Sequence, residues 1–203
     1  MLSAARSKGR RGPPEVVVVG ASAGAIEALL TILPALPAGF PAPVLVVVHL
    51  PATVPSLLAE IFAPRCPMQV REAEDKLEPE PGTIYFAPPD YHLLVEPDRR
   101  LSLSVDDPVN FSRPSIDVLF ESAAEAHGAA LVGALLTGAN DDGARGLAAL
   151  HRAGGVAIVQ EPASARASAM PLAGVRSVPD ALVLPLGEIA RALLDLTAPT
   201  VPS

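Results

Sequence analysis

Strongly apolar runs that alternate with segments of helical periodicity constrain the fold of this chain most strongly. The run at 15–19 is followed by a helical pattern at 25–33, and the run at 44–48 by another at 54–62. Further runs and helical patterns alternate along the second half of the chain, at 115–120, 130–136, 144–153, 156–159, 181–184 and 189–196. A strand buried on both faces reads as a continuous apolar run, and parallel strands are joined by helices. The pattern therefore predicts an α/β fold with a doubly wound, mostly parallel sheet and helices on both faces.

The stretch between residues 83 and 104 has a different pattern. Its runs at 83–87 and 92–95 are short and strand-like. Pro97-Asp98-Arg99-Arg100 has the composition of a turn and leads into the alternating segment Leu101-Ser102-Leu103-Ser104. This stretch predicts an antiparallel hairpin at one edge of the sheet.

One folded domain is expected at 15–196, with flexible tails at 1–14 and 197–203. Half of the 203 residues are apolar, which is typical of a packed domain. The single Cys66 excludes an internal disulfide and fits a reducing compartment. Because the sequence has no apolar run typical of a signal peptide or a membrane span, we expect a cytoplasmic location and no membrane insertion.

The net charge of −7 argues against a general nucleic-acid-binding protein, since phosphate binding requires a concentrated positive surface. Basic residues do gather in the first tail. They form either a solvated leader, which is the favoured interpretation, or an arm that binds polyanions. These residues are Arg6, Lys8, Arg10 and Arg11.

Three polar residues of complementary chemistry each follow one of the predicted strands. Ser22 and His49 come closely after the first two apolar runs, and Asp142 lies in the turn after the run at 130–136. The carboxyl ends of parallel strands share one edge of a sheet, so these side chains can meet there. A hydroxyl, an imidazole that takes its proton and a carboxylate that orients the imidazole are the groups of nucleophilic acyl transfer. Their placement predicts a serine esterase site that requires neither a metal nor a cofactor.

The turn that carries Ser22 supports this prediction. Gly20-Ala21-Ser22-Ala23-Gly24 matches the G-x-S-x-G pattern of a nucleophile exposed between a strand and a helix. Backbone N–H groups near a helix start can stabilise a developing oxyanion, and those of Ala23 and Ala139 are the candidates.

Each of these residues also has a simpler interpretation. Ser22 and Asp142 can cap helices, and His49 can be a packed core histidine. A nucleotide-binding turn is another alternative, but Ser22 replaces a glycine that the G-x-G-x-x-G pattern needs. His49 also stands where that fold places an acidic ribose ligand.

The chain resembles the catalytic domain of the CheB family of chemotaxis methylesterases over nearly all of residues 15–196. The resemblance rests on VVVVGASAGAIEAL, VVVHLPATVPSLLAEIF, PGTIYFAPPDYHLLV, RPSIDVLFESAAE, LTGANDDGARGLAALHRAGG and AIVQEPASARASAMPLAGV. By position it implies that Ser22 is the nucleophile, His49 the base and Asp142 the acid, while Asp141 receives no role.

The same resemblance implies a function. Such an enzyme hydrolyses glutamate γ-methyl esters, and can deamidate glutamine, on the cytoplasmic helices of chemoreceptors. The family commonly has Ser-Thr-Gly-Gly where this chain has Ser22-Ala23-Gly24-Ala25, and often Met where it has Ala139. A catalytically inactive CheB-like interaction domain is therefore the alternative. Family enzymes usually carry an N-terminal receiver domain, for which residues 1–14 are too few, so a separate regulator is expected in its place.

Other polar residues are expected outside the reaction. His92, His127 and His151 have patterns typical of solvated or packing histidines. Arg113 and Asp117 either shape the rim of the site or pair with each other.

Overall fold

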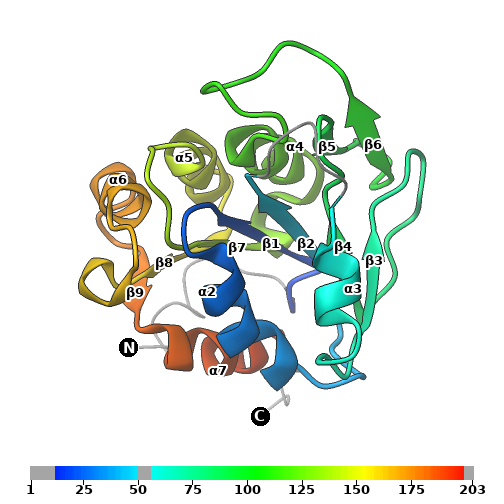
Figure 1. Cartoon of the computed structure of the whole chain (residues 1–203), viewed down its shortest axis with the longest axis horizontal. Helices are drawn as coiled ribbons and strands as arrows, with labels where there is room; N and C mark the ends of the chain where they lie inside the picture. The colour runs from blue at the N-terminus through cyan, green and yellow to red at the C-terminus, as the bar shows by residue number, and fades with distance from the viewer. Residues whose placement is uncertain (1–11, 50–55, 199–203) are drawn as a thin grey trace.

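A seven-stranded sheet, parallel throughout, forms the centre of the computed structural model, which describes residues 12–49 and 56–198 (Figure 1). The strand order across the sheet is β3-β4-β2-β1-β7-β8-β9. The strands are β1 (Val16–Ala21), β2 (Val44–Val48), β3 (Gln69–Glu72), β4 (Thr83–Phe86), β7 (Leu131–Leu135), β8 (Val156–Gln160) and β9 (Leu182–Leu184). The first four strands form one half of the sheet, with β4 inserted between β2 and the edge strand β3, and the last three form the other half. The strand order reverses between β1 and β7.

Helices cover both faces of this sheet, as the fold class predicted from the sequence requires (Figure 1). One face carries α2 (Ala25–Ile32), α3 (Leu58–Phe62) and α7 (Leu186–Thr197). The other carries α4 (Ile116–His127), α5 (Ala144–Arg152) and α6 (Ala169–Ser177). Short 3-10 turns at Leu33–Ala35, Gly128–Ala130 and Pro162–Ser164 complete the connections.

The alternation of side chains along β1 explains why its sequence is uniformly apolar. Val17 and Val19 belong to the core cluster shared with α2 and α7. Val16 and Val18 point to the opposite face and belong to the cluster shared with α4 and α5. Because both faces of the strand are buried, no polar residue separates the apolar ones.

The predicted antiparallel hairpin is present, as β5 (His92–Val95) and β6 (Leu101–Ser104). It forms its own two-stranded sheet beside α4, where the Val95 N–H donates to Ser122 Oγ at 3.1 Å. The run at 83–87, which the sequence pattern placed with the hairpin, is instead the parallel strand β4 between β2 and β3.

Most element boundaries lie close to the predicted ranges. The predicted segment at 54–62 is described only from residue 56, and its helix is α3. The predicted tails fall mainly on residues 1–11 and 199–203, which lie outside the described residues. α7 ends at Thr197, one residue beyond the predicted end of the domain. Within the described ranges, no helix is long and apolar enough to cross a membrane.

Candidate active site

The parallel register brings Ser22, His49 and Asp142 to one edge of the sheet. Ala21 pairs with Val48 across β1 and β2, so Ser22 and His49 are the next residues on neighbouring strands. The His49 N–H donates to the carbonyl of Ala21 at 3.3 Å and extends this pairing past the strand ends. Asp142 follows β7, the other neighbour of β1. The site therefore lies where the strand order reverses, which is where open α/β sheets place ligands.

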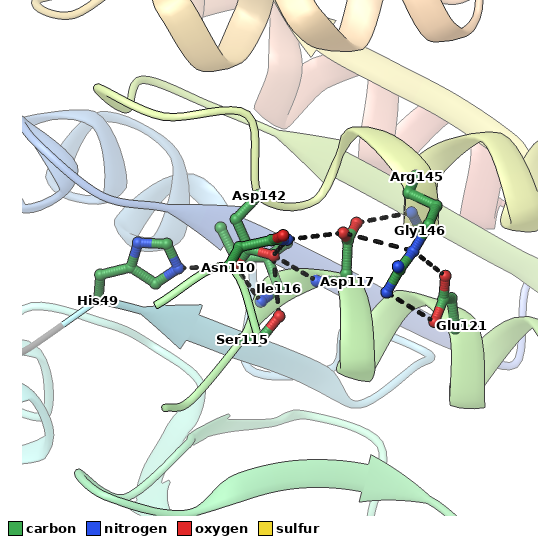
Figure 2. A network of polar contacts seen from close by, with 9 residues as sticks. All are labelled: His49, Asn110, Ser115, Ile116, Asp117, Glu121, Asp142, Arg145 and Gly146. Atoms are coloured by element: carbon green, nitrogen blue, oxygen red, sulfur yellow. Dashed lines mark hydrogen bonds and ion pairs between the residues drawn. The ribbon is translucent and has the colours of Figure 1, made fainter. Parts of the chain in front are cut away.

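A hydrogen bond joins two of the three predicted residues. Nε2 of His49 lies 2.7 Å from Oδ2 of Asp142, and the Asp142 side chain is fully buried (Figure 2). The second ring nitrogen of His49 is directed away from Asp142 (Figure 2). Ser22 is placed by its backbone, since its N–H donates to the carbonyl of Thr137 at 2.9 Å and its carbonyl accepts from the Ala25 N–H at 2.9 Å.

Asp142 caps helix α4. Its carboxylate accepts the backbone N–H groups of Ile116 at 2.7 Å and Asp117 at 3.2 Å, in the first turn of the helix. Ser115 occupies the N-cap position of α4, but its hydroxyl donates to Asp142 Oδ1 at 2.8 Å and makes no capping hydrogen bond itself. Asp142 does not cap α5, the helix that follows it, because Gly143 occupies the N-cap position of that helix. The acid therefore satisfies orphan N–H groups of a different helix, which favours its negative charge.

Gly143 allows this arrangement because a side chain would not fit beside α4. Its φ is +90°, and a Cβ there would lie 2.6 Å from side-chain atoms of both Ile116 and Leu135. Glycine adopts this backbone without strain. The start of α4 can therefore approach Asp142 closely enough for direct hydrogen bonds.

The surroundings of Asp142 favour its ionised form. Burial alone would raise the pKa of the Asp142 carboxyl, but hydrogen bonds from His49, Asn110, Ile116 and Ser115 together lower it below its usual value. An ionised carboxylate only accepts hydrogen bonds, so Nε2 of His49 carries the proton in their shared bond. In the neutral imidazole, Nδ1 of His49 is then the nitrogen that can accept a proton.

Asn110 is a part of the site that the sequence did not indicate. Its side-chain amide nitrogen donates to Asp142 Oδ1 at 2.8 Å and to Asp117 Oδ2 at 2.9 Å (Figure 2). Asp117 is buried as well and also accepts the Gly146 N–H of α5 at 2.7 Å. Burial raises the pKa of Asp117 above its usual value, and the charge of Asp142 adds to that rise. The two carboxylates thus form one electrostatic unit.

Arg113 and Asp117, one of whose two predicted roles was to pair with each other, do not form a pair. Arg113 binds Asp90 instead, at 2.6 Å, and also donates to the carbonyls of Val105 and Asp106. Asp117 lies 3.7 Å from Arg145, whose guanidinium also binds Glu121 (Figure 2). A network of polar contacts therefore runs from Asp142 through Asn110 and Asp117 to Arg145 at the surface. Arg113 lies outside this network and anchors the loop before α4.

The other histidines have structural contacts. His92 is buried in β5, where Nδ1 accepts the Ser115 N–H at 3.1 Å. His127 ends α4 and pairs with Glu15 at 3.1 Å, and His151 lies 3.1 Å from Asp180. His92 is thus a packing residue, whereas His127 and His151 each pair with a carboxylate.

Thr137 holds the turn that carries Ser22. The buried Thr137 hydroxyl donates to the carbonyl of Ala23 at 2.8 Å and accepts the Ala167 N–H at 3.0 Å. Its own N–H donates to the side chain of Gln160 at 2.9 Å. Ala23 and Ala139, the two candidate oxyanion donors, are exposed, and their N–H groups have no acceptor within the described part of the chain. They remain available to a ligand there.

Comparisons with known proteins find relatives in sequence and in fold. The family model described as CheB methylesterase matches residues 17–193. A protein of Leptospira interrogans, by its name a candidate protein-glutamate methylesterase/protein-glutamine glutaminase, is 44% identical over 90% of this chain and 94% of its own. One from Paramagnetospirillum magneticum, named for the same two activities, is 36% identical, but the match spans 50% of its length. The crystal structure of the Thermotoga maritima CheB methylesterase catalytic domain is 32% identical, with a TM-score of 0.86 over 90% of this chain and 98% of that one.

Proposed function

Because this chain belongs to the CheB methylesterase family, we propose that it hydrolyses glutamate γ-methyl esters with Ser22 as nucleophile, His49 as base and Asp142 as acid. The observation that carries the assignment is the 2.7 Å bond between His49 Nε2 and the buried Asp142 carboxylate, beside the turn that holds Ser22. A carboxylate in this position fixes the imidazole tautomer and stabilises the imidazolium that forms when the serine is deprotonated.

The proposed reaction proceeds through an acyl-enzyme. His49 Nδ1 takes the Ser22 hydroxyl proton as Oγ attacks the γ-carbonyl carbon of the ester. The tetrahedral oxyanion lies near the N–H groups of Ala23 and Ala139, and its collapse breaks the bond to the methoxy group, which leaves as methanol with the proton from Nδ1. Water, activated in the same way, then releases the glutamate side chain and restores Ser22.

The proposed substrates are the methylated cytoplasmic helices of chemoreceptors. The curated relatives carry the names of two activities, ester hydrolysis at glutamate and deamidation at glutamine. An ester and an amide pass through similar tetrahedral intermediates, so the same three residues serve both reactions, with ammonia leaving in place of methanol. We therefore include glutamine deamidation in the proposal.

Methanol release from a methylated chemoreceptor cytoplasmic fragment tests this function. The parent protein is compared with Ser22→Ala and with Ser177→Ala, a matched control at an exposed serine at the end of α6. Loss of the nucleophile should reduce the rate by on the order of 10⁶-fold, whereas Ser177→Ala should keep it within about twofold. Equal release by the parent and Ser22→Ala would exclude Ser22 as the nucleophile. No release by any of the three would favour an inactive interaction domain.

A further inference from the structure

Asn110 is the one side chain in Figure 2 that binds both buried carboxylates of the network. It lies in the loop between β6 and α4, and its amide nitrogen is 2.8 Å from Asp142 and 2.9 Å from Asp117. A primary amide nitrogen has two hydrogens, so it can donate one to each carboxylate. Asn110 therefore satisfies both partners at once.

The charges around Asp142 make this position electrostatically demanding. His49 faces Asp142 from the end of β2, and Asp117 faces it from the first turn of α4. Arg145 of α5 lies on the far side of Asp117, is 61% exposed and is shared with Glu121. Two buried carboxylates that share one hydrogen-bond donor lie close enough to oppose each other's ionisation. Neutral donors between them reduce that repulsion without adding a cation that would compete with His49.

The backbone of the loop suits asparagine in particular. Asn110 has a φ of +51°, and the bridge between Val109 and Ser112 closes the turn around it with N–H to O distances of 3.1 and 2.9 Å. Asparagine tolerates this left-handed conformation better than most residues. The next residue, Phe111, also has a positive φ, but its side chain is fully exposed. The turn thus directs one side chain into the network and the other into solvent.

We propose that Asn110 is a positioning residue, which holds the ionised Asp142 toward His49 and separates it from Asp117. The role of Asn110 in turnover rests on the proposed esterase function, but its effect on the two carboxylates does not. Neither family membership nor the sequence pattern of residues 105–114 assigns this role.

Carboxyl titration by NMR on protein labelled with ¹³C at the aspartate side chains tests the proposal without relying on activity. Asn110→Gly removes the amide and keeps a residue suited to positive φ. Phe111→Gly makes the same change one residue later, at a side chain without a polar group. The signals of the pair are assigned from the spectra of Asp142→Asn and Asp117→Asn, and the apparent pKa values are treated as those of a coupled pair.

In Asn110→Gly we expect the lower apparent pKa of the pair to rise by about one pH unit, a tenfold change, because a hydrogen bond to a charged group is lost. The kcat for methanol release should fall about tenfold with little change in KM. Phe111→Gly should leave the lower apparent pKa within about 0.3 pH units of the parent value. An unchanged titration in folded Asn110→Gly would overturn the proposal.

A double variant keeps the test decisive where Asn110→Gly folds poorly. Asn110→Gly combined with Asp117→Asn lacks the second buried charge, so it should fold, and its Asp142 carboxyl should titrate at lower pH than in Asn110→Gly alone. Absence of that recovery would contradict the separating role. A parent protein without esterase activity would refute the proposed function, while the titrations would still decide the role of Asn110.

Discussion

Replacing Asp142 with Asn should weaken folding and catalysis together, because the carboxylate that caps α4 is also the proposed catalytic acid. The Asp142 carboxylate accepts five hydrogen bonds within 3.2 Å, from His49, Asn110, Ser115, Ile116 and Asp117. An amide has one acceptor oxygen, and its NH₂ group would face some of these donors. With two of the charged hydrogen bonds lost, at about 1.5–3 kcal/mol each, we expect a loss of roughly 3–6 kcal/mol in the free energy of unfolding at pH 7.

The pH dependence of this loss gives a second, independent measure. The folded-state pKa of Asp142 is lowered, so its contribution is fully present above the unfolded-state pKa of about 3.9. That contribution disappears as the pH falls through the lower folded-state value. The difference in stability between the parent and Asp142→Asn should therefore be constant near neutral pH and should shrink below about pH 4.

Urea unfolding followed by circular dichroism at several pH values measures the stability change, and methanol release measures activity. We expect a drop in kcat of about 10⁴-fold, as is typical when a triad carboxylate becomes an amide. Asp141→Asn is the matched control, because that neighbouring carboxylate is exposed and has no side-chain partner within the described residues. A stability loss in Asp142→Asn no larger than in Asp141→Asn would refute the capping role, and unchanged turnover would refute the catalytic one.

Two further substitutions test the turn that carries Ser22. Thr137→Val removes the hydroxyl that bonds Ala23 and Ala167, so it should cost about 2 kcal/mol in urea unfolding and lower kcat, whereas Thr137→Ser should lose less. Gly24→Ala places a Cβ 2.9 Å from the Arg166 Cβ at a φ of +87°, so it should cost about 1–3 kcal/mol. Gly187→Ala, at an open helical position in α7, should instead be neutral or stabilise by about 0.5–1 kcal/mol, and a cost equal to that of Gly24→Ala would contradict the argument.

The central strands and their polar successors could be predicted from the sequence because burial on both faces leaves a strong local signal. β1, β2 and β7 are apolar along their length, and the three candidate residues follow them at the same edge. β3 escaped prediction because it is short and largely exposed at the edge of the sheet. α6 was also missed, since Pro171 and Gly174 lie within it and weaken the helical pattern.

The partners of Asp142 could not be predicted, because they come from distant segments. Asn110 is 32 residues away from Asp142 in sequence, in a loop with no periodic pattern. The helix that Asp142 caps starts 26 residues before it, whereas capping rules apply to the helix that immediately follows a residue. The same difficulty explains the suggested pairing of Arg113 with Asp117, since sequence proximity did not reveal Asp90 as the partner. Local chemistry indicated which residues matter, and the tertiary fold determined what they bind.

Helices α4 and α5 are linked through their first turns, and the candidate acid provides one of these links. Asp142, just before α5, accepts N–H groups from the start of α4, and Asp117, in the first turn of α4, accepts the Gly146 N–H of α5. The acceptor for the unpaired N–H groups of α4 therefore lies just before α5, and an acceptor for those of α5 lies in α4. Correct packing of the two helices therefore also sets the distance from Asp142 to His49. A substitution that shifts α4 against α5 should lower kcat without touching Ser22 or His49, so a loss of activity in this region identifies a catalytic group only when stability is measured with it.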